Sequence, residues 1–335
     1  MFIHIRPLNK TGHDSFIDFL KGVCIIFVVL THCIPPTVYN CTLFCLWGDL
    51  AVPLFLVIQV FHAYKKGVEN CRFPSPGKIW KRIILPFLLY QIPIFLLYAV
   101  THKGTMSSHL LWLVKEGGGG PGSYYVWIYL EFAILLPLMS RIPIWKNKWI
   151  CFLVILGVSE MLEVFCSMVS IPDSVYRLLF FRYFFLIWCG TRLIDRDIIL
   201  DTKILILSVA GICLILLFRY SEIDFQPFIC NSKWRIFHWP IYFYVTGLLL
   251  VGISCLYGFT NKHAKKLNHI IELAGKSSYE IFLFQMLWFY VINSFDQPVA
   301  EFLSIDKTVL EYIVFIISVP VCVWPIIKIK DRSSS

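Results

Sequence analysis

The chain has 335 residues, of which 58% are hydrophobic and only 15% are charged. Soluble proteins average about 45–50% apolar and about 25% charged residues, so this composition excludes an ordinary water-soluble enzyme. The apolar residues form long blocks without a Gly-X-Y or heptad repeat, which excludes collagen, coiled-coil and disordered proteins. The sequence therefore predicts an all-α polytopic membrane protein. Its formal net charge of +9 is typical of basic loops at a membrane surface, and no nucleic-acid partner is expected.

Apolar blocks of about 20 residues, the length that crosses the hydrocarbon core, define the predicted membrane spans. About ten such blocks follow one another along the chain. They cover 16–34, 42–63, 79–100, 123–140, 148–169, 175–194, 202–219, 237–259, 270–293 and 308–327. The fifth to seventh blocks are the hardest to divide, because Asp173, Arg177 and Arg182 interrupt them.

The distribution of Lys and Arg predicts how the chain is oriented in the membrane. Twenty of these residues fall in one set of alternate loops and termini, and six fall in the other. Since cytoplasmic loops carry the excess, the N-terminus (1–15) and the tail (328–335) are both predicted to be cytoplasmic. We expect no cleavable signal peptide before the first span. We expect a single membrane domain over 1–335.

A glycine-rich segment, Gly-Gly-Gly-Gly-Pro-Gly at 117–122, leads directly into the fourth predicted span. Such a run predicts a flexible hinge. It could act as a lid over an outward-facing cavity, or it could be a mobile connector without a role in binding.

Cysteine and histidine spacing gives no sign of a metal site. Four cysteines, Cys33, Cys41, Cys45 and Cys230, are predicted near the outer face. Their spacing leaves open whether any of them form a disulfide. No metal cofactor is expected.

Two ionisable residues in the first predicted span form the strongest candidate site, because such residues are costly inside a bilayer. Lys21 and His32 are eleven positions apart, which places them on one helical face, about 16 Å apart along the axis. Lys21 could instead be an anchor that pairs with Asp18 one turn earlier, and a neighbouring helix could satisfy His32. A neutral histidine has the pKa range that a general base needs.

The segment from Lys21 to His32 resembles the (Arg/Lys)-x10-His signature in the first helix of the acyltransferase 3 family. Further segments resemble this family along most of the chain: Val52-Pro-Leu-Phe55, Arg82-Ile-Ile-Leu-Pro86, Gly122-Ser-Tyr-Tyr-Val-Trp127-Ile-Tyr-Leu-Glu131 and Gly275-Lys-Ser-Ser-Tyr279-Glu280-Ile-Phe-Leu. The chain departs from the family pattern at Gln59-Val60, where Ser-Gly is common, and at Gln285, where histidine is common. Ile79 also stands where the family commonly has the first arginine of an Arg-x-x-Arg motif.

The resemblance implies a ten-helix O-acyltransferase in the inner membrane of a bacterium. It implies that an acyl group, usually acetyl from acetyl-CoA, is transferred to a hydroxyl of a cell-surface or exported polysaccharide, with His32 as catalytic base or acyl carrier. The donor would be held by Lys21, Lys78, Lys81, Arg82, Tyr279 and Glu280. Topology and anionic lipid also require basic residues in the loop that holds Lys78 to Arg82, so their presence alone does not establish donor binding.

The acceptor side would include Tyr124, Trp127, Glu131 and Arg182. The aromatic residues could stack on sugar or belong to an interfacial belt, and we expect Glu131 to pair with Arg182, Arg177 or a tyrosine hydroxyl. Expected partners are acyl-CoA, a glycan acceptor, the lipid bilayer and the machinery of envelope polysaccharide synthesis. The alternatives are a secondary transporter or exporter of an envelope glycan, a structural subunit of an envelope synthase, and a succinyl instead of an acetyl transferase.

Overall fold

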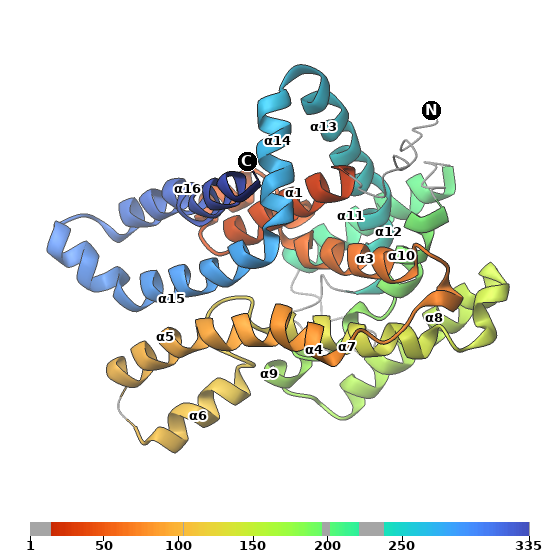
Figure 1. The fold of residues 1–335 in the computed structure, drawn as a ribbon, viewed down its shortest axis with the longest axis horizontal. Helices are drawn as coiled ribbons and strands as arrows, with labels where there is room; N and C mark the ends of the chain where they lie inside the picture. Colours follow the sequence, from red (N-terminus) through yellow and green to blue (C-terminus); the bar gives the residue numbers. More distant parts are fainter. Residues whose placement is uncertain (1–14, 103, 196–201, 221–237, 335) are drawn as a thin grey trace. The chain divides into compact units, whose positions relative to one another are not determined.

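The computed structural model describes residues 15–102, 104–195, 202–220 and 238–334, and every regular element in these ranges is helical (Figure 1). Residues 1–14, 103, 196–201, 221–237 and 335 lie outside the described residues. Six described helical stretches are long and apolar enough to cross a membrane: Phe44–Tyr64, Pro76–Thr101, Lys148–Met168, Thr202–Tyr220, Trp239–His263 and Lys307–Lys330. The prediction of an all-α protein is thereby confirmed for the described residues, and six candidate membrane spans among them agree with the prediction of a membrane protein.

These six stretches coincide with the second, third, fifth, seventh, eighth and tenth predicted spans. The fourth predicted span is the shorter apolar helix α7 (Tyr124–Met139). The first is α1 (Ser15–Thr31), which ends four residues before Pro35.

The span predicted over 175–194 is wrong as a single helix. The structure has α9 (Asp173–Tyr176), a 3-10 turn (Phe181–Tyr183) and α10 (Leu186–Asp195). Where the helix is interrupted, the buried Arg182 side chain donates from Nη2 to the carbonyl of Arg177 at 3.1 Å. A carbonyl that a continuous helix would use internally is thus satisfied by a side chain.

The span predicted over 270–293 is also divided. Residue Ser277 separates α14 (Lys265–Lys276) from α15 (Ser278–Leu303). Glycine and serine near this point favour a helix end, since glycine lacks a Cβ and serine competes for backbone hydrogen bonds. The helix that begins at Ser278 therefore starts later than the sequence predicted.

The described chain forms two compact units. We call residues 15–51, 75–124 and 259–334 the His32 unit, and residues 52–74 and 125–258 the Arg182 unit. Each unit is assembled from segments that lie far apart in the sequence, so neither corresponds to one half of the chain.

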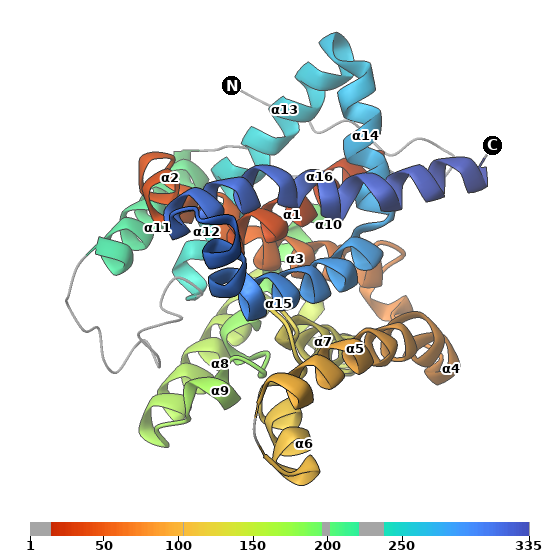
Figure 2. The same ribbon diagram turned by 90° about the vertical axis from the view of Figure 1, so that its left-hand side faces the viewer.

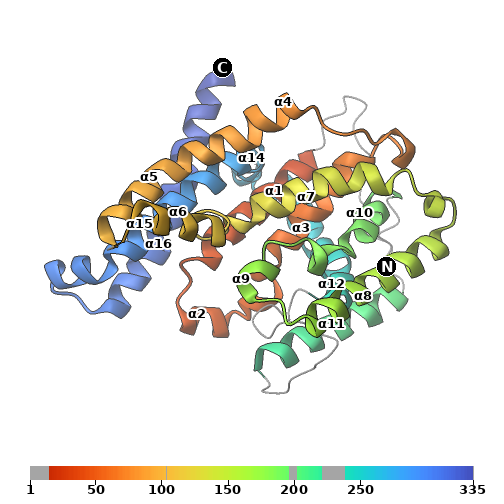
Figure 3. The same ribbon diagram turned by 90° about the horizontal axis from the view of Figure 1, so that it is seen from below.

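Helix α1 is at the centre of the His32 unit and packs against α14, α15 and α16. The other helices of this unit are α2 (Pro36–Cys41), α4 (Pro76–Ile79), α5 (Leu85–Thr101), α6 (Met106–Lys115), α14, α15 and α16 (Lys307–Ser334). Figure 1 shows α15 and α16 as a hairpin, and Figure 2 shows α16 running alongside α1. Helices α5 and α15 lie side by side in Figure 3. Almost one whole side of α1 is buried, including Phe19, Leu20, Ile25 and Val29.

The Arg182 unit contains α3 (Ala51–Tyr64), α7, α8 (Lys148–Met168), α9, α10, α11 (Thr202–Tyr220), α12 (Tyr242–Tyr244) and α13 (Leu250–His263). Two side chains of α3 hydrogen-bond the backbone of α7. Gln59 Nε2 donates to the carbonyl of Tyr129 at 2.9 Å, and the Tyr64 hydroxyl donates to the carbonyl of Leu136 at 2.8 Å. The carbonyl of Leu136 also accepts from Ser140 N–H at 3.0 Å. Pro137, which follows it, has no N–H and cannot donate the helical hydrogen bond to the carbonyl of Ala133.

Candidate functional site

His32 is the first residue after α1 and lies in the turn that ends the helix. Its backbone N–H donates to the carbonyl of Val29 at 3.2 Å. Its half-buried side chain packs against the buried ring of Phe289 on α15, with 5.8 Å between ring centroids. The predicted histidine therefore lies within the packed interior between α1 and α15, at the end of a helix instead of inside one.

The glycine-rich segment, here called the glycine loop (117–123), approaches the same region. Gly117, Gly118, Gly120 and Gly122 have φ between +68° and +115°, a backbone conformation that residues with a Cβ rarely adopt. Residues 117–119 and Ser123 are buried. A run of this composition predicts flexibility, but the structure has a packed, buried loop.

Gln91 on α5 accounts for much of this packing. Its Oε1 accepts from Gly119 N–H at 2.6 Å, and its Nε2 donates to the carbonyl of the same residue at 3.3 Å. The Ser123 hydroxyl also donates to the carbonyl of Gly118 at 3.0 Å. Side chains thus satisfy the backbone of this loop in the way that a regular element would. A role of the loop as a lid or as a mobile connector stays a prediction.

At Gly122 the glycine loop meets His32. A Cβ built on Gly122 would lie 3.7 Å from His32 Nε2, 3.8 Å from Gln285 Nε2 and 3.2 Å from the ring of Phe282. Gln285 is fully buried on α15, and its Nε2 donates to the carbonyl of Pro121 at 3.2 Å. The imidazole of His32 and the amide of Gln285 thus share one small neighbourhood beside a glycine.

Lys21 forms the ion pair with Asp18 that one interpretation of the sequence predicted, with 3.6 Å between Nζ and Oδ1. The two residues are one turn apart on α1, and the Lys21 side chain is about one-quarter exposed. This prediction is confirmed, and a role of Lys21 toward the donor stays a prediction.

The basic residues before α5 are exposed. Lys78 lies in α4, whereas Lys81 and Arg82 lie in a π-helical turn, Trp80–Ile84. The carbonyl of Ile83 in this turn accepts a 2.6 Å hydrogen bond from the Tyr279 hydroxyl of α15. A π-helical turn often marks a functional site in a helix, and here it places the backbone beside Arg82 in contact with Tyr279.

Glu280, the residue after Tyr279, pairs with Lys330 of α16, with 3.7 Å between Oε1 and Nζ. Lys330 lies in the predicted cytoplasmic tail (328–335) and is not among the predicted site residues. The structure therefore adds a cation from α16 to the end of the unit where α15 begins, and pairs it with a predicted donor residue.

The predicted acceptor residues do not all belong to one unit. Tyr124 begins α7 and lies in the His32 unit, whereas Trp127, Glu131 and Arg182 lie in the Arg182 unit. The Arg182 guanidinium lies over the ring of Tyr183, 4.6 Å from its centroid.

The predicted pairing of Glu131 with an arginine or a tyrosine hydroxyl is wrong. Its carboxylate accepts from the backbone N–H of Phe180, and its buried Oε2 has no hydrogen-bond partner among the described residues. Backbone N–H groups are released where the sixth predicted span is interrupted, and one of them reaches Glu131 in place of a charged side chain.

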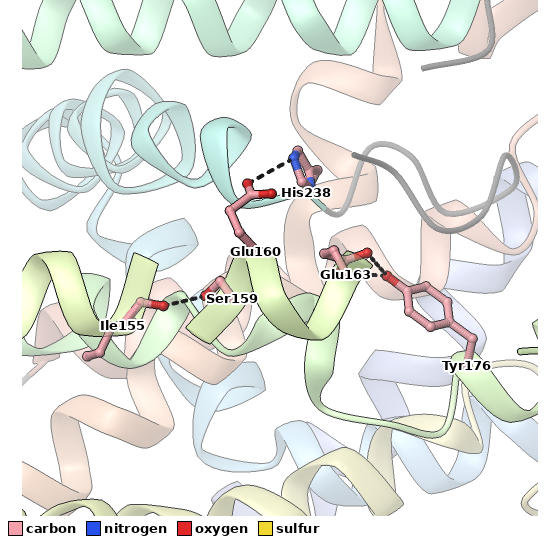
Figure 4. Close-up of polar contacts among 6 residues, drawn as sticks. All are labelled: Ile155, Ser159, Glu160, Glu163, Tyr176 and His238. Carbon is pink, nitrogen blue, oxygen red and sulfur yellow. Dashed lines mark hydrogen bonds and ion pairs between the residues drawn. The ribbon is translucent and has the colours of Figure 1, made fainter. Parts of the chain in front are cut away.

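Sequence reasoning missed a polar cluster on α8 in the Arg182 unit (Figure 4). His238 Nε2 lies 3.7 Å from Glu160 Oε1, and the buried Tyr176 hydroxyl lies 2.8 and 2.9 Å from the two carboxylate oxygens of Glu163. Both glutamates lie inside the fifth predicted span, so the rule that marks ionisable residues in apolar spans would have found them.

Gln91 and Gln285 were also missed as parts of the His32 site. Gln285 was noted only as a departure from a family pattern, and a neutral amide gives little signal in an apolar helix. Among the described cysteines, Cys33, Cys41 and Cys45 are free thiols, and Cys230 lies outside the described residues. The described residues include no group of three or more His, Cys, Asp or Glu that could hold a metal ion.

Comparison with known proteins adds one finding. A family model described as an acyltransferase domain matches residues 14–327, which is nearly the whole chain. No curated protein and no solved structure matches it. The match covers both compact units and includes His32, the glycine loop and α15. The chain is therefore a multi-pass membrane protein that belongs to the acyltransferase 3 family.

Proposed function

We propose that this protein transfers an acetyl group from acetyl-CoA to a hydroxyl of a cell-surface or exported polysaccharide. One observation carries the proposal: His32 Nε2 lies beside Gly122, where a Cβ would be only 3.7 Å away, so the nitrogen of a half-buried imidazole lies next to a backbone without a side chain. Such a nitrogen can take a proton from an attacking hydroxyl.

The reaction uses His32 twice. The acceptor hydroxyl attacks the thioester carbonyl while His32 Nε2 takes the hydroxyl proton. The new C–O bond forms, the C–S bond breaks, and the imidazolium returns its proton to the departing thiolate of coenzyme A. Polar N–H groups near the carbonyl, such as the Gln285 amide, favour the negative charge that develops on its oxygen. If a covalent acyl-histidine formed, the acyl group would be transferred twice, first from the thioester to the histidine nitrogen and then from that nitrogen to the acceptor hydroxyl.

In this proposal the chain has ten membrane spans and both termini are cytoplasmic, in the inner membrane of a bacterium. The 20-to-6 distribution of basic residues supports this orientation. Lys78, Lys81 and Arg82 face the cytoplasm and bind the phosphates of coenzyme A through charge-assisted hydrogen bonds. Their exposure supports this role.

The donor arm then extends past Lys21, Tyr279 and Glu280 toward His32, and the glycan approaches from the outer side. Tyr124, which belongs to the same unit as His32, contributes to the acceptor side, and polysaccharide synthesis enzymes supply the acceptor. No metal takes part in the proposed chemistry.

The test is mass spectrometry of envelope glycan from cells that carry the wild type, His32→Ala or His269→Ala. His269 is an exposed histidine of α14 and serves as the matched control. We expect acetyl esters to be lost with His32→Ala and kept with His269→Ala, at equal protein levels in the membrane. Full acetylation in the His32 variant would overturn the proposal, as would loss of surface polymer with intact acetylation, which would indicate export.

A further inference from the structure

Gln285 on α15 presents an unused acceptor to the His32 site. The side chain is fully buried. Its orientation follows from Pro121, because a carbonyl oxygen only accepts and the amide nitrogen must therefore face it. Oε1 then points away from that carbonyl and has no hydrogen-bond partner in the described part of the chain. A buried acceptor in this state costs free energy until a donor reaches it.

The residues that flank Gln285 along α15 are apolar. Phe282 and Met286 flank it along α15, and Phe289 lies one turn further; all three are buried. A sugar, with hydroxyls around its ring, would need several polar partners in such surroundings. A narrow apolar arm that carries isolated amides would need only one or two polar partners.

The pantetheine arm of coenzyme A has this character. Two methylene groups separate the nitrogen of its cysteamine amide from the sulfur of the thioester. A residue that accepts from this N–H therefore lies a few bonds away from the carbonyl under attack. Gln285 and His32 are near enough for this relationship, since their Nε2 atoms both lie within 3.8 Å of the position of a Cβ on Gly122, and Gln285 Oε1 is bonded to the same carbon as its Nε2.

We infer that Gln285 Oε1 accepts a hydrogen bond from the cysteamine amide N–H of the acyl thioester and so holds the thioester beside His32. The inference rests on the proposed function, because it requires a thioester donor. This hydrogen bond makes Gln285 a residue that binds the acyl donor. The second hydrogen on the Gln285 Nε2 is available to the site.

The experiment measures binding of two ligands to the purified full-length protein by equilibrium dialysis. One ligand is acetyl-CoA, and the other is its analogue with an ester oxygen in place of the cysteamine N–H. We expect the wild type to bind acetyl-CoA about tenfold more tightly, since a lost hydrogen bond leaves a buried acceptor unpaired. Gln285→Met, which keeps the side-chain length without the amide, should bind both ligands equally and at the weaker affinity.

Gln59→Met is the matched control. Gln59 also donates from Nε2 to a backbone carbonyl and has a buried Oε1 without a hydrogen-bond partner in the described chain, but it lies in the Arg182 unit. It should keep the tenfold preference. Equal binding of the two ligands by the wild type would overturn the inference without need of any variant, as would a preference retained in Gln285→Met. If the wild type bound neither ligand, the proposed donor itself would be wrong.

Discussion

Gly22 on α1 and Gly275 on α14 bring the backbones of these two helices into direct contact. A Cβ on Gly275 would collide with the carbonyl of Asp18 and lie 2.9 Å from the nitrogen of Gly22. A Cβ on Gly22 would collide with the carbonyl of Ile271. Small residues permit such close approach of helices in membranes. Since His32 directly follows α1, this contact helps to determine where the imidazole lies.

The contact predicts that Gly275→Ala destabilises the protein. The added methyl would meet the backbone of α1 at Asp18 and Gly22, and overpacking of this kind costs about 1–3 kcal/mol. The midpoint of thermal unfolding in detergent measures the change. Gly258→Ala is the control, because a Cβ on Gly258 in α13 meets nothing within 4 Å. It should leave stability unchanged or raise it by about 0.5–1 kcal/mol through better helix propensity. Equal midpoints for Gly275→Ala and the wild type would contradict the contact.

A second prediction concerns the clamp between Gln91 and Gly119. Gln91→Leu removes two hydrogen bonds and leaves a buried N–H and carbonyl without partners, at a cost of about 1–3 kcal/mol for each group. We expect faster hydrogen–deuterium exchange across the glycine loop and a transfer rate at least about tenfold lower. Gln59→Leu, which removes one hydrogen bond in the Arg182 unit, should leave exchange in this loop as it is. Unchanged loop exchange in Gln91→Leu would show that the clamp does not hold the loop.

A third prediction concerns the effect of the exposed cations before α5 on the kinetics of transfer. Replacing Lys78, Lys81 and Arg82 with alanine should raise KM for acetyl-CoA at least about tenfold with little change in kcat, since the phosphates lie far from the reacting carbonyl. Added salt should weaken donor binding by the wild type more than by the variant. Lys65→Ala together with Lys66→Ala, at exposed positions after α3, is the control. A fall in kcat alone would assign these residues another role.

Tyr176 and Glu163 provide a prediction about stability. Tyr176→Phe removes a hydroxyl that bonds a buried carboxylate at 2.8 and 2.9 Å, so the free energy of unfolding should fall by about 1–3 kcal/mol. Tyr220→Phe, at an exposed position at the end of α11, should have no effect. If both variants unfold like the wild type, the bonded pair contributes little to the Arg182 unit.

The sequence predicted features that depend on neighbours along the chain. The apolar length of each span, the Lys21–Asp18 pair one turn apart and the position of His32 after an apolar helix all follow from local pattern. The Gln91–Gly119 and Gln285–Pro121 contacts do not, because their partners are 28 and 164 positions apart. A neutral amide follows no periodicity that would reveal its partner, so both glutamines needed the structure.

Composition also misled where tertiary contacts override local tendency. Six consecutive residues at 117–122 are glycine or proline and predicted flexibility, yet the positive φ values of these glycines are what allow the loop to be buried. The sixth predicted span was predicted as one helix because of its apolar content, although it contains Arg177 and Arg182. Those two residues mark the interruption, because Arg182 satisfies a carbonyl that the break releases.

The two hydrogen bonds between Gln91 and Gly119 have a consequence for motion during turnover. Gly119 is enclosed by Gln91, Ile94 and Trp112, so water cannot readily replace either bond. Separating the loop from α5 would therefore cost more free energy than a movement of the loop and α5 together. Admission of substrate to His32 should accordingly displace α5 and residues 117–119 as one piece, and spin labels on the two segments should keep a constant separation while their distances to α1 change.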